Sequence, residues 1–172
     1  MGENFYLKLP QADDVTKVSD IPLAIEDGIN TPARLCVRYR FNRRQAFYYL
    51  QAAESLGLIF RRANKYSLTR EGRRYTSLTP VRRKEILVRS MLFSPIVARI
   101  ILELLISPHN RLTRRQVMDI AAAHAGISGT TIPRRVQSLF SWLSWLSEET
   151  GLLNVSKANI SMTVSSRTQH SS

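Results

Sequence analysis

The chain has 172 residues, enough for one medium domain or two small ones and too few for a large multidomain enzyme. Hydrophobic residues make up 44% and charged residues 22%, with 7 Gly and 7 Pro, so the composition predicts an ordinary globular fold. Lys and Arg number 25 against 13 Asp and Glu, and the resulting net charge of +12 indicates an anionic partner.

The positive charge is concentrated after residue 33. Residues 1–33 hold two Lys and six acidic residues, and nearly all the bases beyond them are Arg. The planar guanidinium group of Arg binds phosphates and guanine edges through paired hydrogen bonds. We therefore expect nucleic acid as the partner, with a basic, well-solvated surface or recognition by an acidic protein as the alternative.

Cysteine usage and hydropathy bear on the compartment. The single Cys36 cannot form an internal disulfide and no apolar stretch opens the chain, so we expect a cytoplasmic, nucleoid-associated location. The most apolar segment, residues 96–106, is too short to span a bilayer and contains Arg99 and Glu103. It predicts a core helix, and we expect no membrane partner.

Helix-start signals recur along the chain. A hydroxyl residue precedes a proline at Thr31, Thr79 and Ser94, the pattern of an N-cap followed by proline in the first turn. Residues 42–45 and 113–116 have the spacing of a capping box. With the apolar periodicity, these signals predict seven helices, over residues 17–28, 32–40, 43–56, 80–92, 95–106, 114–125 and 132–149.

Two similar stretches each follow a predicted helix and begin with glycine. Residues 57–69 read GLIFRRANKYSLT and residues 151–163 read GLLNVSKANISMT. Each has an apolar pair, a polar arm, a tip with Ala-Asn and then the alternation of a strand, so we expect two short β-hairpins. Because three helical segments precede each hairpin, we interpret the chain as a repeat of one unit, with a chance match over so few letters as the alternative.

Three helices followed by a hairpin resemble the winged helix, a helix-turn-helix variant whose third helix usually enters the DNA major groove. Residues 66–72, YSLTREG, look like the Leu-Thr-x-x-Gly ending of many prokaryotic winged-helix regulators. The second unit departs from the pattern, with a longer turn at residues 126–130 and Met-Thr-Val at residues 162–164. Residues 17–164 are similar to tandem winged-helix modules of prokaryotes, including the recognition portions of modular restriction endonucleases.

The expected fold is mainly α with two short β-hairpins, arranged as two winged-helix units in tandem. The predicted parts are a loose N-terminal segment over 1–16, unit 1 over 17–78, a linking helix over 79–93, unit 2 over 94–164 and a disordered tail over 165–172.

The predicted helix over residues 43–56 has an apolar face, with Ala46, Phe47 and Leu50, and an opposite polar stripe. Arg can fork onto guanine and Gln onto adenine, and Tyr can contact a phosphate or a thymine methyl group. We interpret as base-reading the residues Arg44, Gln45, Tyr48, Gln51 and Ser55. An ordinary solvated helix face is the alternative.

Bases at helix starts and around the first hairpin are candidate phosphate ligands, because the N-terminus of a helix favours an anion. They are Arg43, Arg61, Arg62, Lys65, Arg70, Arg73 and Arg74 in unit 1, and Arg114, Arg115, Arg134 and Arg135 in unit 2. We interpret Ser141, Trp142 and Trp145 as an interface with unit 1 or a second copy of the chain, with packing inside the monomer as the alternative.

Patterns for catalysis are missing from the sequence. No Asp or Glu is followed two positions later by Lys, no Cys and His have zinc spacing, and there is no Gly-rich phosphate loop. We expect a non-enzymatic protein, without metal or cofactor, that binds double-stranded DNA for transcriptional regulation or for target recognition in a restriction or mobile-element system. It could work as a homodimer or with a separate catalytic or regulatory subunit; the alternative is a protein–protein adaptor using the Trp142 and Trp145 face.

Overall fold

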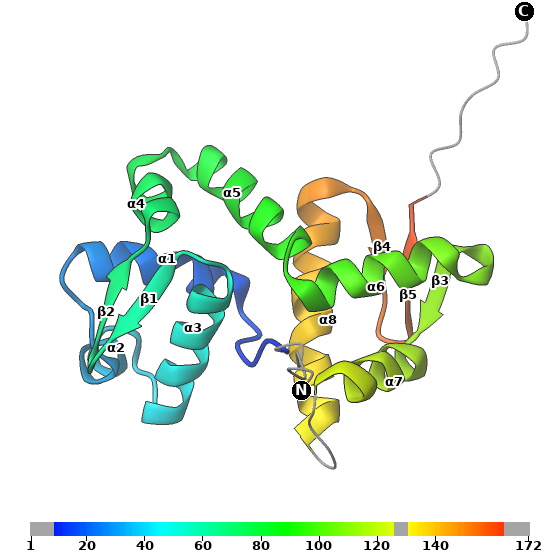
Figure 1. Ribbon diagram of the computed structural model, residues 1–172, viewed down its shortest axis with the longest axis horizontal. Helices are drawn as coiled ribbons and strands as arrows, with labels where there is room; N and C mark the ends of the chain where they lie inside the picture. Colours follow the sequence, from blue (N-terminus) through cyan, green and yellow to red (C-terminus); the bar gives the residue numbers. More distant parts are fainter. Residues whose placement is uncertain (1–8, 126–130, 164–172) are drawn as a thin grey trace, which may run out of the picture.

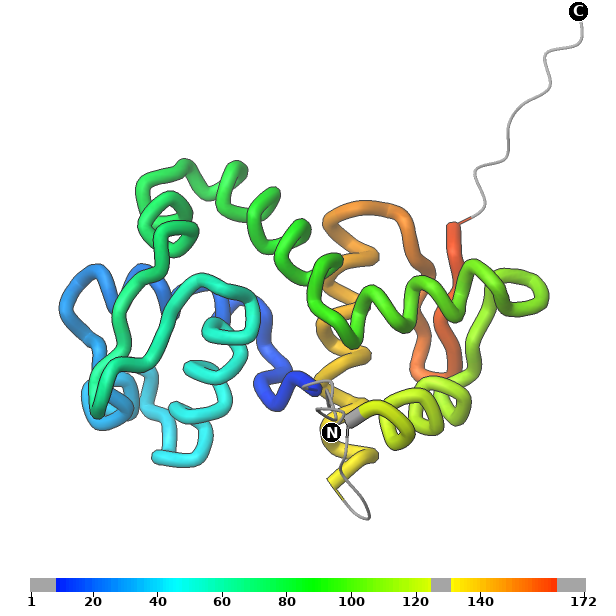
Figure 2. Tube along the Cα trace, in the orientation of Figure 1, coloured from blue at the N-terminus to red at the C-terminus, as the bar shows by residue number. Residues whose placement is uncertain are grey.

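Helices dominate the computed structural model, which describes residues 9–125 and 131–163 (Figures 1 and 2). These residues form eight α-helices and two small antiparallel sheets. The prediction of a mainly α fold with two short β-hairpins is confirmed. No helix within the described ranges is long and apolar enough to cross a membrane.

The first half of the chain consists of three helices, a hairpin and a fourth helix. Each of the first three helices begins at a side-chain cap, because Asp14, Thr31 and Asn42 accept a hydrogen bond from the backbone N–H three residues later. Asn42 and Gln45 form the predicted capping box. The elements are α1 (Val15–Glu26), α2 (Pro32–Tyr39), α3 (Arg43–Ser55), β1 (Ile59–Arg62), β2 (Lys65–Leu68) and α4 (Arg70–Ser77).

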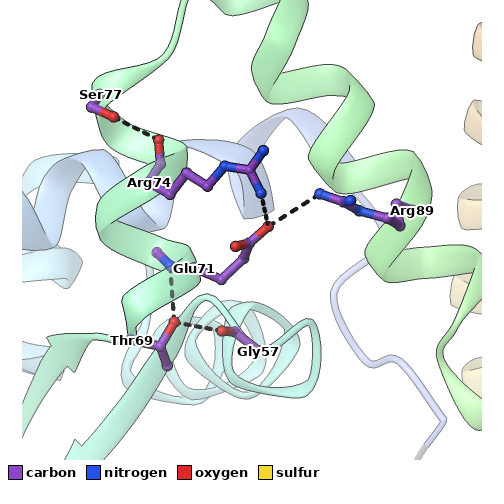
Figure 3. Close-up of polar contacts among 7 residues, drawn as sticks. Gly57, Thr69, Glu71, Arg74, Ser77 and Arg89 are labelled. Atoms are coloured by element: carbon purple, nitrogen blue, oxygen red, sulfur yellow. Dashed lines mark hydrogen bonds and ion pairs between the residues drawn. The ribbon is translucent and has the colours of Figure 1, made fainter.

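The Leu-Thr-x-x-Gly sequence after the first hairpin closes this half. The hydroxyl of Thr69 accepts from the N–H of Gly72 at 2.9 Å, which caps α4, and donates to the carbonyl of Gly57 at 2.6 Å (Figure 3). A Cβ atom at Gly72 would lie 1.9 Å from the carbonyl oxygen of Leu58, so α4 approaches the hairpin this closely only with glycine there.

The second half follows a linking helix and contains a three-stranded sheet. Strand β5 pairs antiparallel with both neighbours, in the order β3-β5-β4. The elements are α5 (Pro80–Leu92), α6 (Pro95–Ile106), a 3-10 turn (Pro108–Asn110), β3 (Arg111–Thr113), α7 (Arg114–Ala125), α8 (Thr131–Thr150), β4 (Leu153–Val155) and β5 (Asn159–Met162).

Both halves share one order of elements: a helix, an extended segment, two helices and a hairpin. In the first half the extended segment contains Asn30, whose carbonyl accepts a hydrogen bond from the N–H of Tyr66 in β2 at 2.9 Å. In the second half the extended segment is β3, which pairs with β5. In each half, therefore, the extended segment lies beside the second strand of the hairpin.

Residues 9–14 are packed between the two halves. Leu9 and Ala12 belong to the core, and Trp142 of α8 donates its indole N–H to the carbonyl of Ala12 at 2.8 Å. The prediction of a loose segment is therefore wrong for residues 9–16. Apolar side chains of residues 9–14 pack between the two halves, and residues 15 and 16 form the beginning of α1. Residues 1–8 and the predicted tail over 165–172 lie outside the described residues.

Helix α8 lies at the centre of the molecule, between the first half and the sheet of the second (Figure 1). Its buried residues cover a wide arc, and it contacts α1 and α5 as well as α7 and β4. Ser138 donates to the carbonyl of Gln11 at 3.3 Å, and Lys84 of α5 pairs with Glu149 at 2.6 Å. These contacts fix the two halves relative to each other.

Candidate nucleic-acid interface

The third helix of each half begins at the same edge of the molecule. Figure 1 shows α3 and α8 both rising from the lower edge, with the tips of the two hairpins pointing toward the lower side. Side chains link the two helices, because Nη2 of Arg134, in the first turn of α8, lies 3.1 Å from the hydroxyl of Tyr48, near the middle of α3. Helix α7 also begins beside a hairpin tip, since the N–H of Arg114 donates to the carbonyl of Ala158 at 2.7 Å.

These helix starts and hairpin tips define a basic edge. Its bases come from both halves: Arg43, Arg44, Arg61, Arg62, Lys65, Arg115, Arg134, Arg135 and Lys157. All of them are exposed except Arg135, which is half-buried. Lys157 is the one that the sequence interpretation omitted, although its place at the tip of the second predicted hairpin could have indicated it.

The ion pairs among the described residues lie away from the basic edge. The described residues contain six ion pairs, and none involves a base of this edge. The acidic partners lie directly before α1, on α4, α5 and α6, and at the end of α8. They are Asp14, Glu71, Glu85, Glu103 and Glu149. These five acidic residues therefore neutralise bases elsewhere. Glu54 lies beside the edge, where its carboxylate accepts from the backbone N–H of Arg61 at 3.2 Å, but the bases of the edge outnumber it and the edge keeps a net positive charge.

A groove of about 740 Å³ opens between α2, α3 and the first hairpin. Arg43, Arg61 and Asn64 supply its polar lining, while Phe47 and Tyr66 supply apolar surface. Phe47 was expected on the core-facing side of α3, but it is only half-buried because it lines this groove. The groove joins the beginning of α3 to the hairpin.

The predicted base-reading residues lie at the surface of α3, with Tyr48 half-buried and the others exposed. Both glutamines among them are held by neighbouring polar groups. The side-chain oxygen of Gln45 accepts from the N–H of Asn42 at 2.9 Å in the capping box. The side-chain oxygen of Gln51 accepts from the side-chain amide of Gln11 at 3.0 Å.

Tyr48 stands between two arginines from opposite halves. Nε of Arg44 and Nη2 of Arg134 both donate to its hydroxyl, and Cζ of Arg134 lies 5.0 Å from the centroid of its ring. Partial burial acts to raise the pKa of Tyr48, but the hydrogen bonds and charges of the two arginines outweigh it and lower this pKa below its ordinary value. This part of the stripe faces the second half of the chain.

Three predicted phosphate ligands, Arg70, Arg73 and Arg74, lie on α4, away from the basic edge (Figure 1). Arg73 donates to the carbonyl of Leu68 at 2.9 Å, and Arg74 pairs with Glu71 at 3.6 Å. Glu71 also pairs with Arg89 of α5, as Figure 3 shows, so these contacts attach α4 to the hairpin and to α5.

Arg114 is also held inside the chain, although it begins α7 as predicted. Its guanidinium carbon lies 4.6 Å from the ring centroid of Phe140, and its Nη2 donates to the side-chain oxygen of Gln137 at 2.9 Å. Arg114 therefore attaches α7 to α8, and its neighbour Arg115 presents the exposed charge.

The tryptophans lie at a contact with the first half of the chain, which is one of the two interfaces expected for them, and Trp142 is only 2% exposed there. Its indole N–H bonds Ala12, while Ser141 donates to the carbonyl of Gln137 at 3.2 Å. Trp145 is half-buried against the core and lines a cavity beside α1. Trp142 and Trp145 therefore pack within the chain, against residues 9–14 and α1.

The chain belongs to the protein family described as a domain of unknown function (DUF7226), which matches residues 22–151. The match starts within α1 and ends directly after α8, so one family unit includes α5 and parts of both halves. No curated protein and no solved structure matches the chain. Within the described ranges, no group of three or more His, Cys, Asp and Glu side chains could hold a metal ion.

Proposed function

We propose that the protein is a pair of winged-helix units that binds double-stranded DNA along the basic edge and catalyses no reaction. The element order and the place of the extended segment beside each hairpin support this assignment. In such a unit the third helix is the recognition helix, so α3 and α8 take this role. The function is transcriptional regulation or target recognition in a restriction or mobile-element system, in the cytoplasm and at the nucleoid.

One observation carries the proposal: the bases of the edge come from both halves, and no ion pair in the described residues compensates them. A charged edge of this kind follows the phosphate backbone of a duplex. Arg43 and Arg61 contact phosphates beside the groove, and Arg115 and Arg134 contact them from the second half. The exposed side chain of Gln51 reads base edges.

The protein–protein adaptor, the alternative function, has less support. It required an exposed tryptophan face, but Trp142 is buried and bonded to Ala12 inside the chain. DNA binding is therefore the function that the arrangement of residues supports best.

The experiment is a salt titration of duplex affinity, measured by fluorescence anisotropy on the full chain. The log–log slope should be about −0.9 per phosphate contact, with about five to eight contacts. The double variant Arg43→Ala/Arg61→Ala should reduce the magnitude of the slope by about two. The control, Arg82→Ala/Arg89→Ala, removes the same charge from ion-paired positions on α5 and should leave the slope unchanged. Affinity that persists at high salt, or equal effects of the two variants, would refute the proposal.

A further inference from the structure

Two positively charged groups from opposite halves converge on one hydroxyl at the junction. Arg44 and Arg134 both donate to Tyr48, and their guanidinium carbons lie 5.5 and 5.0 Å from the centroid of its ring. Tyr48 therefore acts as a spacer that holds the two guanidinium groups close together. The ring interactions favour this arrangement, while the like charges repel each other.

No carboxylate among the described residues lies within ion-pair distance of this pair. No ion pair in the described residues involves Arg44, Arg134 or the next residue, Arg135. Nε of Arg135 is buried and has no hydrogen-bond partner among those residues. Arg135, Gln11 and Glu54 line a cavity of about 350 Å³ at the same junction, where the Glu54 carboxylate forms no ion pair with Arg135. Arg134 also reaches the side-chain oxygen of Gln11 at 3.4 Å.

We infer that Arg44 and Arg134 form one oxyanion site, which takes a single phosphate group of the DNA backbone, with Tyr48 as the positioning residue. The inference rests on the proposed DNA binding and adds to it that one phosphate bridges the two halves. Two guanidinium groups supply several N–H donors to the oxygens of one tetrahedral anion. The bound anion removes the repulsion between them, so binding stabilises the junction.

A free oxyanion offers a test that does not depend on DNA. The thermal midpoint of the full chain is measured with millimolar sodium sulfate and with sodium chloride at equal ionic strength. Sulfate should raise the midpoint in a saturable way, because a ligand that binds only the folded state stabilises it by mass action. The general stabilising effect of excluded sulfate grows without saturation, so only the saturable part of the rise is assigned to binding.

Matched variants locate the effect. Arg134→Gln should lose the saturable rise, whereas Arg62→Gln, which removes the same charge from the exposed hairpin, should keep it. Arg134 is exposed, so its substitution leaves the fold intact, and the midpoint in chloride checks this point. A rise of equal size in both variants overturns the site.

A double-mutant cycle on duplex affinity tests the bridging phosphate. If Arg44 and Arg134 hold the same phosphate, the product of the fold-losses for Arg44→Gln and Arg134→Gln exceeds the fold-loss of the double variant. The control pair, Arg62→Gln and Arg134→Gln, should give fold-losses that multiply. Multiplying losses for Arg44 and Arg134 contradict a shared phosphate in DNA.

The two experiments separate the sources of the anion. A sulfate effect without duplex binding keeps the oxyanion site, assigns it to free phosphate or sulfate, and refutes the DNA-binding proposal instead. Coupling on DNA without a sulfate effect restricts the site to phosphodiesters. Absence of both effects overturns the inference.

Discussion

The indole N–H of Trp142 donates to the carbonyl of Ala12 at 2.8 Å, across 130 positions of sequence. This bond ties the central helix of the second half to the segment that leads into the first helix. Both groups lie in the core, where water cannot replace a lost partner. The junction between the two halves therefore depends on a polar contact as well as on apolar packing.

Replacing Trp142 by Phe should destabilise the protein by about 1–3 kcal/mol, because the carbonyl of Ala12 stays buried without its donor. The measurement is urea unfolding followed by circular dichroism. Trp145→Phe is the control, since Trp145 is half-buried and its indole makes no hydrogen bond with the described residues. Trp145→Phe should lower the free energy of unfolding clearly less than Trp142→Phe does. Similar losses in the two variants would show that the hydrogen bond to Ala12 contributes little.

Gly72→Ala should destabilise the fold by about 3 kcal/mol, because the new Cβ would overlap the carbonyl of Leu58 and force α4 away from the hairpin. Gly151→Ala is the matched control: its φ is +66°, but no atom lies within 4 Å of a Cβ there. Its cost should be about 1–2 kcal/mol from backbone strain alone. Thermal unfolding of both variants checks the order, and a larger loss for Gly151→Ala would contradict the close approach at Gly72.

Helix positions were readable from the sequence because their signals are local. Three starts with a hydroxyl residue before proline, at Thr31, Thr79 and Ser94, coincide with the beginnings of α2, α5 and α6. Strand β3, with three residues, is too short to show alternation. The burial of Leu9 and Ala12 depends on α8, which is more than 100 residues away, and no local pattern encodes such a contact.

The sequence predicted which kinds of residue make up the candidate site, but not which groups each of its arginines contacts. The clusters on the first hairpin and on α4 look alike in sequence, yet Arg74 is paired with Glu71 and Arg62 has no ion pair in the described residues. The contact of Arg134 with Tyr48 joins residues 86 positions apart. Which arginine meets a carboxylate depends on tertiary packing, and spacing along the chain does not determine it.

Stability should fall as the pH rises from about 10 to about 12, in part because of Tyr49. Burial, with the charge of Asp13, raises the pKa of Tyr49 to about 12. In this window the unfolded state has already lost the proton that the folded state keeps, so the free energy of unfolding decreases with pH. Below about pH 10 both states keep the proton, and the group contributes no pH dependence.

The test is urea unfolding at several pH values in this window for the wild type and for Tyr49→Phe. The variant should lose less stability as the pH rises. A smaller decline should remain, because burial also raises the pKa of Tyr39, Tyr66 and Tyr75. Identical pH profiles for the two proteins would exclude a contribution from Tyr49.

Two glutamines of α3 provide the sharpest test of base reading. Gln51 lies on the exposed stripe, so Gln51→Ala should weaken binding to a selected site by about 1–3 kcal/mol and binding to random duplex much less. Gln45 is exposed too, but its side-chain oxygen caps the helix, so Gln45→Ala should lower stability by about 1 kcal/mol with a smaller effect on discrimination. The DNA site is obtained by selecting bound duplexes from a random pool. The affinity of each variant is then measured by anisotropy titration on this site and on random duplex. Equal losses on selected and random duplex for Gln51→Ala would remove Gln51 from the base-reading set and leave it as a partner of Gln11 alone.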